Sequence, residues 1–259
     1  MRTDSFRIET AIFLAAICSQ TYTQYESKNE SFIVPSGFQL VEPFRAKSFD
    51  GISESFGFVL QSSEQVIVAF RGTSSTSDWI SDALARQIKY KWVPNSGWTH
   101  RGFTEIYESA RKQIHNILKA VSPNKRLIVT GHSLGAALAT LCAVDLSVNS
   151  TFKNPIVYTY GSPRVGNESF ARCFNQLIGT TNRIHNKYDV VTHLPTVLIK
   201  MPKSDTWYSY IHVQIGNQLE FQNGSVSANH IISSYFDNLA KRDPIYTEQL
   251  RKQNPGLCP

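Results

Sequence analysis

The sequence lacks any long hydrophobic run. The chain has 259 residues, 41% of them hydrophobic, but no apolar stretch approaches the ~18 residues needed to cross a bilayer. This excludes a polytopic membrane protein and leaves no transmembrane segment to predict. The apolar fraction is too high for a disordered chain, and a chain of this length removes roughly 70–75% of its unfolded surface on folding. We therefore expect a globular protein with a sizeable core.

Cysteine is scarce, with four residues in the chain. This density is too low for a disulfide-stapled scaffold, and no cysteine or histidine spacing is typical of a zinc site. We expect Cys142, which lies in an apolar helical stretch, to belong to the core. Cys18 and Cys258 lie near opposite ends of the chain, and the sequence leaves open whether they pair. Nothing predicts a metal ion or another cofactor.

Basic residues form no dense cluster. Lysine and arginine number 26 against 20 acidic residues, a net charge of +6. Nucleic-acid binding requires a concentrated basic stripe on a recognisable module, and because neither is present we expect no nucleic-acid partner. Solubility is enough to explain this mild excess of positive charge. Weak attraction of the protein to anionic lipid surfaces remains open. The oligomeric state cannot be read from these residues.

The N-terminus does not resemble a secretory signal. Such a signal has a positive first region, 7–15 apolar residues and a small-residue cleavage site. Here Asp4 and Glu9 precede a minimal apolar stretch at 11–18, which we interpret as an amphipathic first helix. For the chain as printed this favours the cytoplasm, whereas a processed form of a longer precursor would be secreted.

Strand-like and helix-like segments alternate along the chain. Strand patterns lie at 56–60, 65–70, 127–129, 156–160, 183–185 and 210–215, and the run 219–221 could pair with the last of these through Gly216-Asn217. Helical patterns lie at 102–121, 133–148, 167–178 and 230–239. The alternation predicts an α/β fold, with a mostly parallel central sheet and helices on both faces. No linker rich in proline, glycine or serine divides the chain, so we expect one domain over residues 1–259.

The most specific local feature is the segment Gly131-His132-Ser133-Leu134-Gly135. It lies between the buried strand pattern at 127–129 and a helix rich in small residues, which is the strand–turn–helix setting of a nucleophile elbow. Glycines two residues before and two residues after the serine let the strand and the helix approach closely. The pattern predicts Ser133 as a nucleophile.

A serine nucleophile needs a histidine base, and the histidine needs a carboxylate that orients it. In elbow-type enzymes the order along the chain is serine, acid, histidine. Asp189 is the best-placed acid, because it follows a strand pattern and precedes a loop marked by Pro195. Asp205 is a weaker candidate. Asp145 points away from the elbow end of its helix, and Asp237 comes too late.

Three histidines follow Asp189. His193 lies on the same loop as the acid and is typical of a solvent-facing residue, and His212 lies in a strand-like run where a structural histidine is expected. His230 follows a polar loop and begins a helical pattern, so a loop could bring it to the strand ends. Position favours His230 as the base but leaves His212 open.

Taken together, these segments resemble the class 3 lipase family of α/β-hydrolases, which includes triacylglycerol lipases of filamentous fungi, feruloyl esterases and bacterial relatives. The match covers roughly residues 60–236 and is far more specific than the elbow alone. Its segments are Ala69-Phe70-Arg71-Gly72-Thr73, Asp78-Trp79-Ile80, His100-Arg101-Gly102-Phe103, the elbow with Ala137-Leu138-Ala139-Thr140, Tyr160-Gly161-Ser162-Pro163-Arg164-Val165-Gly166-Asn167, Asp189-Val190-Val191, Leu194-Pro195, and His230 with Tyr235-Phe236.

The resemblance implies an α/β-hydrolase fold and a carboxylic ester hydrolase with nucleophile Ser133, acid Asp189 and base His230. It also implies an oxyanion hole built from the backbone amides of Thr73 and Leu134. The expected substrate is an acylglycerol or a similar ester, presented in water or at a lipid–water interface. Phospholipase A1 or feruloyl esterase activity at the same site, and a catalytically silent lipid-binding protein, remain as alternatives.

The resemblance also bears on a candidate lid, on two departures from the family and on two arginines. It places a lid at residues 74–88, where apolar residues recur at helical spacing, although an ordinary surface helix explains the same pattern. The chain departs from the family by carrying Ala136 and Thr192 at positions where relatives often have glycine and proline. Arg71 and Arg164 could anchor a substrate, but we expect them to form internal ion pairs that tie loops to the sheet.

Overall fold

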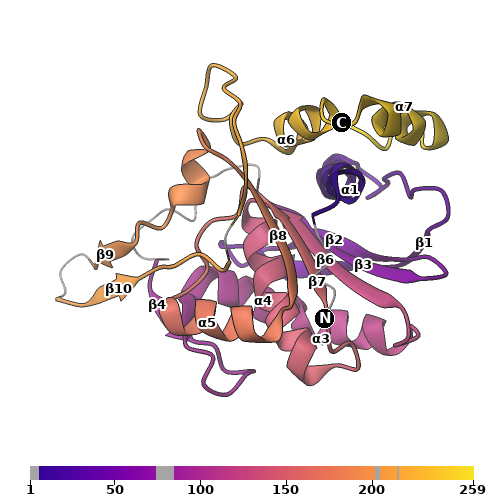
Figure 1. Ribbon diagram of the computed structural model, residues 1–259. Helices are drawn as coiled ribbons and strands as arrows, with labels where there is room; N and C mark the ends of the chain where they lie inside the picture. The colour runs from indigo at the N-terminus through magenta and orange to yellow at the C-terminus, as the bar shows by residue number, and fades with distance from the viewer. Residues whose placement is uncertain (1–5, 74–84, 202–204, 215) are drawn as a thin grey trace.

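The computed structural model describes residues 6–73, 85–201, 205–214 and 216–259 (Figure 1). Its helices are α1 (Ile8–Glu26), α3 (Arg101–Lys119), α4 (Leu134–Asn149), α5 (Glu168–Leu177), α6 (Ile232–Ala240), α7 (Pro244–Gln253) and the 3-10 helix η1 (Val190–His193). Its strands are β1 (Gln39–Lys47), β2 (Ser53–Gln61), β3 (Gln65–Phe70), β4 (Gln87–Lys89), β5 (Trp98–His100), β6 (Arg126–His132), β7 (Ile156–Tyr160), β8 (Thr180–Asn186), β9 (Leu198–Lys200), β10 (Trp207–Ser209) and β11 (Asn217–Leu219).

Among the described residues, seven strands form the central sheet in the order β1-β2-β3-β6-β7-β8-β11. Strands β3, β6, β7, β8 and β11 run parallel to one another, while β1 and β2 pair antiparallel at one edge. The pairs β4–β5 and β9–β10 form two small separate hairpins. The expected mostly parallel α/β sheet is confirmed.

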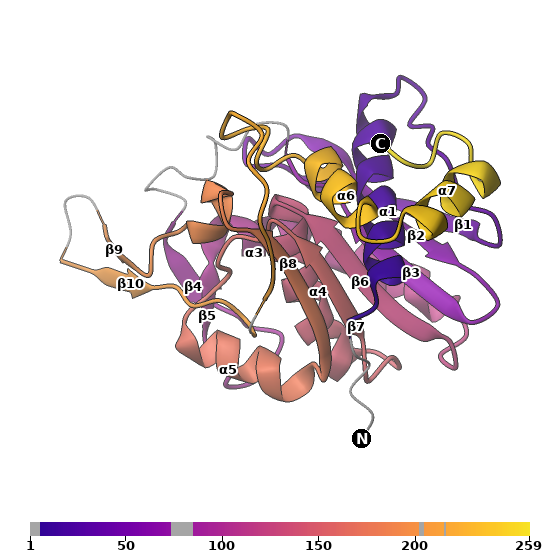
Figure 2. The same cartoon turned by 45° about the horizontal axis from the view of Figure 1, so that its top comes forward.

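Helices cover both faces of this sheet (Figures 1 and 2). One apolar cluster joins α1, α6 and α7 to one face, through residues such as Ile17, Ile128 and Phe236. The other cluster joins α3, α4 and α5 to the opposite face. Because both faces are buried, β3 and β6 read as continuous apolar runs rather than as alternating patterns. The carboxyl ends of the parallel strands are thereby held together at one edge.

Helix α1 is longer and more deeply enclosed than an amphipathic surface helix. It spans Ile8–Glu26, and polar residues on it are buried together with its apolar ones. The amide nitrogen of Gln20 donates to the carbonyls of Gly256 and Leu257, and its amide oxygen accepts from the backbone N–H of Ile33. The expectation of an amphipathic helix at 11–18 was wrong, because segments far along the chain cover the second face of this helix.

The strand expected at 210–215 is absent from the described part of that segment. Only Ile211 pairs, in an isolated bridge with Gly166, and Gln214 has a positive φ of 49° that ends any extended run. Strand β11 instead adds to the open edge of β8 in parallel register. The predicted hairpin between 210–215 and 219–221 was therefore wrong, because β11 pairs with the edge strand β8 and not with the segment that precedes it along the chain.

All four cysteines are free thiols. Cys18 is fully buried beneath the sheet, where its thiol makes a hydrogen bond of 3.3 Å with the hydroxyl of Thr130, and burial raises its pKa to about 12. Cys18 does not pair with Cys258. Cys142 lies in the core as expected.

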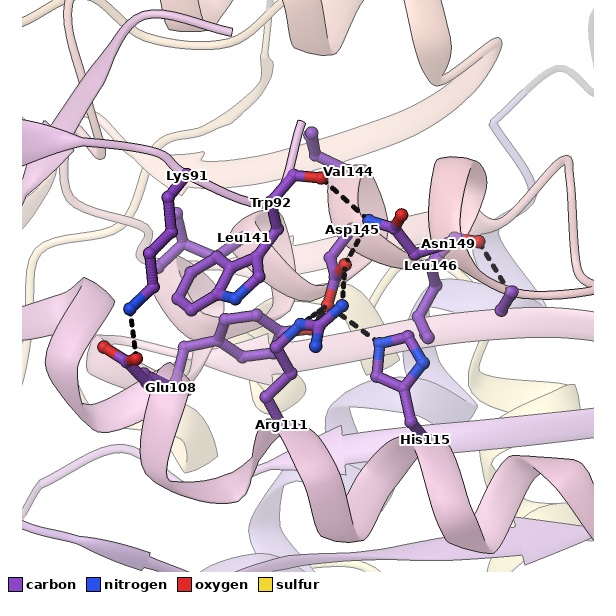
Figure 3. Close-up of polar contacts among 12 residues, drawn as sticks. Lys91, Trp92, Glu108, Arg111, His115, Leu141, Val144, Asp145, Leu146 and Asn149 are labelled. Atoms are coloured by element: carbon purple, nitrogen blue, oxygen red, sulfur yellow. Dashed lines mark hydrogen bonds and ion pairs between the residues drawn. The ribbon is translucent and has the colours of Figure 1, made fainter. Parts of the chain in front are cut away.

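A buried carboxylate near the C-terminal end of α4 ties this helix to α3 (Figure 3). Asp145 accepts from Tyr107 Oη at 2.5 Å, from Arg111 Nε at 2.7 Å and from Asn149 Nδ2 at 2.7 Å, and it contacts His115 Nε2 at 2.9 Å. Burial alone would raise the pKa of this carboxyl, but the hydrogen bonds from His115, Arg111 and Tyr107 outweigh it and hold the pKa well below its usual range. Asp145 is a cross-brace between helices, in agreement with its exclusion as a partner of Ser133.

Candidate active site

Ser133 lies in the turn between β6 and α4, with φ 58° and ψ −125°. A non-glycine residue with this geometry stores backbone strain, typically about 1–3 kcal/mol, and persists only where its surroundings enforce it. Here a Cβ at Gly131 would lie 2.3 Å from the carbonyl oxygen of Gly135, and one at Gly135 would lie 2.3 Å from that of Phe70. Neither position can carry a side chain, so the two glycines are what permit the close approach around Ser133.

The structure brings Ser133, His230 and Asp189 together across 97 and 41 residues of sequence separation. His230 Nε2 lies 2.8 Å from Ser133 Oγ, and its Nδ1 lies 2.7 Å from Asp189 Oδ2. All three residues are buried. Because a carboxylate oxygen can only accept, Nδ1 donates to Asp189, which leaves Nε2 free to accept from the Ser133 hydroxyl.

Asp189 follows β8 and caps η1. Its Oδ1 accepts from the backbone N–H of Val191 at 2.9 Å, and its Oδ2 accepts from Tyr235 Oη at 2.7 Å as well as from His230. The Tyr235 hydroxyl in turn accepts from the Asn186 N–H at 2.9 Å. The sequence analysis did not assign this function to Tyr235, which lies 46 residues from Asp189, and only the tertiary fold places the two side by side.

The other candidate residues lie elsewhere. His212 Nε2 donates to the Thr192 carbonyl at 2.7 Å, and burial lowers the pKa of His212 to about 3. His193 is exposed, and Asp205 forms an exposed ion pair with Lys200. Thr192, which stands where relatives often carry proline, donates from its hydroxyl to the Asp189 carbonyl at 2.8 Å. This hydrogen bond holds the turn that carries Asp189.

The two residues expected to form the oxyanion hole lie on separate segments: Leu134 directly follows Ser133, and Thr73 follows Gly72, where a Cβ would lie 3.1 Å from the Cβ of Ser133. Leu134 is the first residue of α4, where helix N–H groups have no partner within the helix. Thr73 lies two residues after Arg71, whose guanidinium is buried. Arg71 Nε donates to the Ser55 carbonyl at 2.9 Å, and Arg71 Nη2 pairs with Glu54 at 2.6 Å. The ion pair expected for Arg71 is confirmed.

Arg164 differs from the expectation of an ion pair. Its guanidinium donates to the backbone carbonyls of His193 and Pro195, and no ion pair to it occurs among the described residues. It still ties the loop after the acid to the chain after β7, but through carbonyls.

Most of the expected lid at 74–88 lies outside the described residues. Of the remainder, Ala85 is buried, and Gln87–Lys89 forms β4 in a hairpin with β5. The helical spacing therefore does not extend through Ile88.

Within the described part of the chain, no group of three or more histidine, cysteine, aspartate or glutamate side chains could hold a metal ion. No helix in that part of the chain has the length and apolar character to span a membrane.

Comparison with known proteins shows which proteins this chain is similar to. The family model of class 3 lipases matches residues 67–199. The lipase of Rhizomucor miehei is 36% identical over 143 residues, which cover 52% of this chain and 38% of that protein. Phospholipase A1-II 3 of Oryza sativa subsp. japonica is 30% identical over 223 residues, covering 69% of this chain and 52% of that protein. The chain thus matches only about two fifths to one half of the length of these relatives.

Solved structures show the same fold. The lipase of Rhizopus microsporus var. chinensis superimposes with a TM-score of 0.62 at 28% identity, over 84% of this chain and 75% of that one. A crystal structure of a mutant form of MDLA from Penicillium cyclopium gives a TM-score of 0.64 at 26% identity, over 84% of this chain and 80% of that one. With the elbow, the sheet order and the family match in agreement, the chain belongs to the class 3 lipase family.

Proposed function

We propose that the protein is a serine carboxylic ester hydrolase, in which Ser133 is the nucleophile, His230 the base and Asp189 the acid that orients it. The observation that carries this proposal is the chain of hydrogen bonds from Ser133 through His230 to Asp189, set on a strained elbow. A serine hydroxyl becomes a competent nucleophile only when such a base accepts its proton.

The geometry supports the following reaction. As Ser133 Oγ attacks the ester carbonyl carbon, His230 Nε2 accepts its proton, and Asp189 stabilises the resulting imidazolium. The backbone amides of Thr73 and Leu134 stabilise the oxyanion, and each such donor contributes about 3–4 kcal/mol. His230 then donates the proton to the departing alkoxide, which leaves an acyl group on Ser133. A water molecule, deprotonated by His230, releases the acid.

We propose an acylglycerol-type substrate. The support lies in relatives such as the Rhizomucor miehei lipase and the secreted mono- and diacylglycerol lipase 1 of Fusarium solani, the latter 34% identical over 138 residues. Phospholipase A1 activity is the second candidate, because the relative from Oryza sativa subsp. japonica, which carries that name, matches a larger share of this chain.

We also propose that the protein works at a lipid–water interface. The hairpin β9–β10 projects from the body of the molecule (Figure 2), and it carries Leu198, 61% exposed, and Trp207, 59% exposed. In the register of the hairpin Trp207 lies opposite Lys200 and Ser209 opposite Leu198, so Leu198 and Trp207 share one face. Tryptophan beside an apolar residue and a cationic one is a combination suited to the surface of a lipid layer.

The decisive experiment is a chain-length series of p-nitrophenyl esters, combined with a serine-directed phosphonate. The wild type should hydrolyse esters and become labelled at Ser133, while S133A should lose both properties without unfolding. Ser147→Ala is the matched control, because that buried serine on α4 donates only to the Val144 carbonyl, and it should keep both. Labelling at another serine would overturn the assignment.

Two histidine variants test the choice of base. His230→Ala should lose several orders of magnitude in kcat, as S133A does, since members of such a triad act as one unit. His212→Ala should affect mainly stability, because its ring contacts the Thr192 carbonyl and neither Ser133 nor Asp189. Near-wild-type turnover by His230→Ala would contradict the proposal.

A protein that binds lipid vesicles but hydrolyses no ester would instead be the catalytically silent lipid-binding protein.

A further inference from the structure

Tyr22, near the C-terminal end of α1, reaches the rear of the candidate active site. Its hydroxyl lies 2.7 Å from His132 Nδ1. A Cβ at Gly72 would lie only 2.1 Å from this hydroxyl and 3.1 Å from the Cβ of Ser133. Gly72 directly precedes Thr73, and His132 directly precedes Ser133. The hydroxyl of Tyr22 therefore lies where the segment leading to the oxyanion hole meets the segment leading to the nucleophile.

His132 links Tyr22 to His230. Its Nε2 lies 2.7 Å from the backbone carbonyl oxygen of His230. A carbonyl can only accept, so Nε2 carries the hydrogen and Nδ1 must accept from the Tyr22 hydroxyl. Burial, together with the neighbouring His230, keeps the pKa of His132 well below its usual value. His132 is therefore neutral, and its two hydrogen bonds select a single tautomer.

The base is thus held at two points. Asp189 orients its ring, and His132 anchors its backbone carbonyl. The rings of His132 and His230 also pack against each other, with centroids 4.7 Å apart. His230 lies in a turn between β11 and α6, and the anchor ties this turn directly to β6, the strand that carries the nucleophile.

We propose that Tyr22 and His132 are positioning residues for the reaction: they form a hydrogen-bonded relay that sets the spacing between Ser133 and His230. This inference rests on the proposed ester hydrolase function. Tyr22 lies outside the segment 67–199 matched by the family model, and it acts through His132 without touching the reacting atoms. Because catalysis is sensitive to displacements of about 1 Å, releasing this relay should act on turnover more than on substrate binding.

Tyr22→Phe tests the relay by removing one hydroxyl and leaving the ring in place. On a soluble p-nitrophenyl ester we expect kcat to fall about tenfold, while KM changes less than about twofold. Tyr90→Phe is the matched control. Its hydroxyl is buried and donates to the Leu141 carbonyl at 2.7 Å, on the other face of the sheet. It should lose a similar amount of thermal stability and keep kcat.

A double-mutant cycle separates a relay from independent effects. His132→Leu removes both hydrogen bonds and should lower kcat by more than Tyr22→Phe does. Adding Tyr22→Phe to His132→Leu should then cause no further loss. His132→Gln can still donate to the His230 carbonyl, so it should recover part of the activity that His132→Leu loses.

Three outcomes would overturn the inference: wild-type kcat in Tyr22→Phe, an equal fall of kcat in Tyr90→Phe, or additive losses in the double variant. Failure of the proposed function has a different signature. It appears in the wild-type protein, as absent hydrolysis and absent labelling of Ser133, and it would remove this inference with it.

Discussion

Gly161 shows how a single missing side chain shapes the candidate site. It follows β7 with a φ of 56°, a conformation that favours glycine. A Cβ at this position would lie 2.9 Å from Asp189 Oδ2 and 3.1 Å from His230 Cε1. The glycine therefore leaves room for the contact between the acid and the base.

We predict that Gly161→Ala lowers kcat at least about tenfold and destabilises the fold by about 1–3 kcal/mol, because it adds backbone strain and pushes Asp189 from His230. Turnover of a soluble ester and urea unfolding would measure the two effects. Gly179→Ala is the control, since a Cβ there meets nothing within 4 Å, and it should change neither value by much. Full activity in Gly161→Ala would show that the acid–base contact tolerates displacement.

At the scale of single residues, the sequence predicted the residues of the candidate site better than the residues that hold them in place. Ser133 could be found from its glycines, and Asp189 from its place after a strand. His230 could not be separated from His212 by position alone, because both lie on segments that return to the same sheet edge. Tyr235 had only a place in the family resemblance and Tyr22 left no local signal, since each is defined by a partner more than 40 residues away.

At the scale of elements, the hairpin β9–β10 presents the apolar side chains of Leu198 and Trp207 to solvent. We predict that the double variant with Leu198→Ser and Trp207→Ser loses about three- to tenfold of its activity on emulsified lipid, because it loses apolar contact with the lipid layer. Its activity on a soluble ester should stay within about twofold of the wild type.

The control for the hairpin is Ile245→Ser on α7. This residue is 73% exposed and its helix lies far from β9–β10 in both views (Figures 1 and 2). It should retain activity on both substrates. Equal losses on the soluble and the emulsified substrate in the hairpin variant would contradict interfacial docking by this element.

At the scale of the whole molecule, Asp145 links the helix after the nucleophile to α3. We predict that Asp145→Asn lowers the free energy of unfolding by about 3–5 kcal/mol at pH 7, because Arg111 loses its buried counter-charge. Since the folded pKa of Asp145 is depressed, its contribution is present above the unfolded value of about 3.9 and is lost as the pH falls through the folded value.

Urea unfolding of both proteins between pH 7 and pH 2 would measure this contribution. The difference between wild type and Asp145→Asn should be constant above about pH 5 and shrink below about pH 4. Asp205→Asn removes an exposed carboxylate paired with Lys200, and as a control it should change stability by less than about 0.5 kcal/mol. A difference that does not depend on pH would exclude the charge of Asp145 as its source.

The sequence by itself determined the parts of this protein whose signals are local: the buried runs of β3, β6 and β7, the helices α3, α4 and α5, and the elbow at Ser133. Periodicity and glycine spacing act over a few residues, so they can be read without the fold. The tertiary structure decided the pairing of β11 with β8, the enclosure of α1, the position of His230 rather than His212 beside Ser133 and Asp189, and the contacts of Tyr22 and Tyr235. Each of these depends on which distant segment covers a given face or edge, and that is settled by packing against the sheet as a whole.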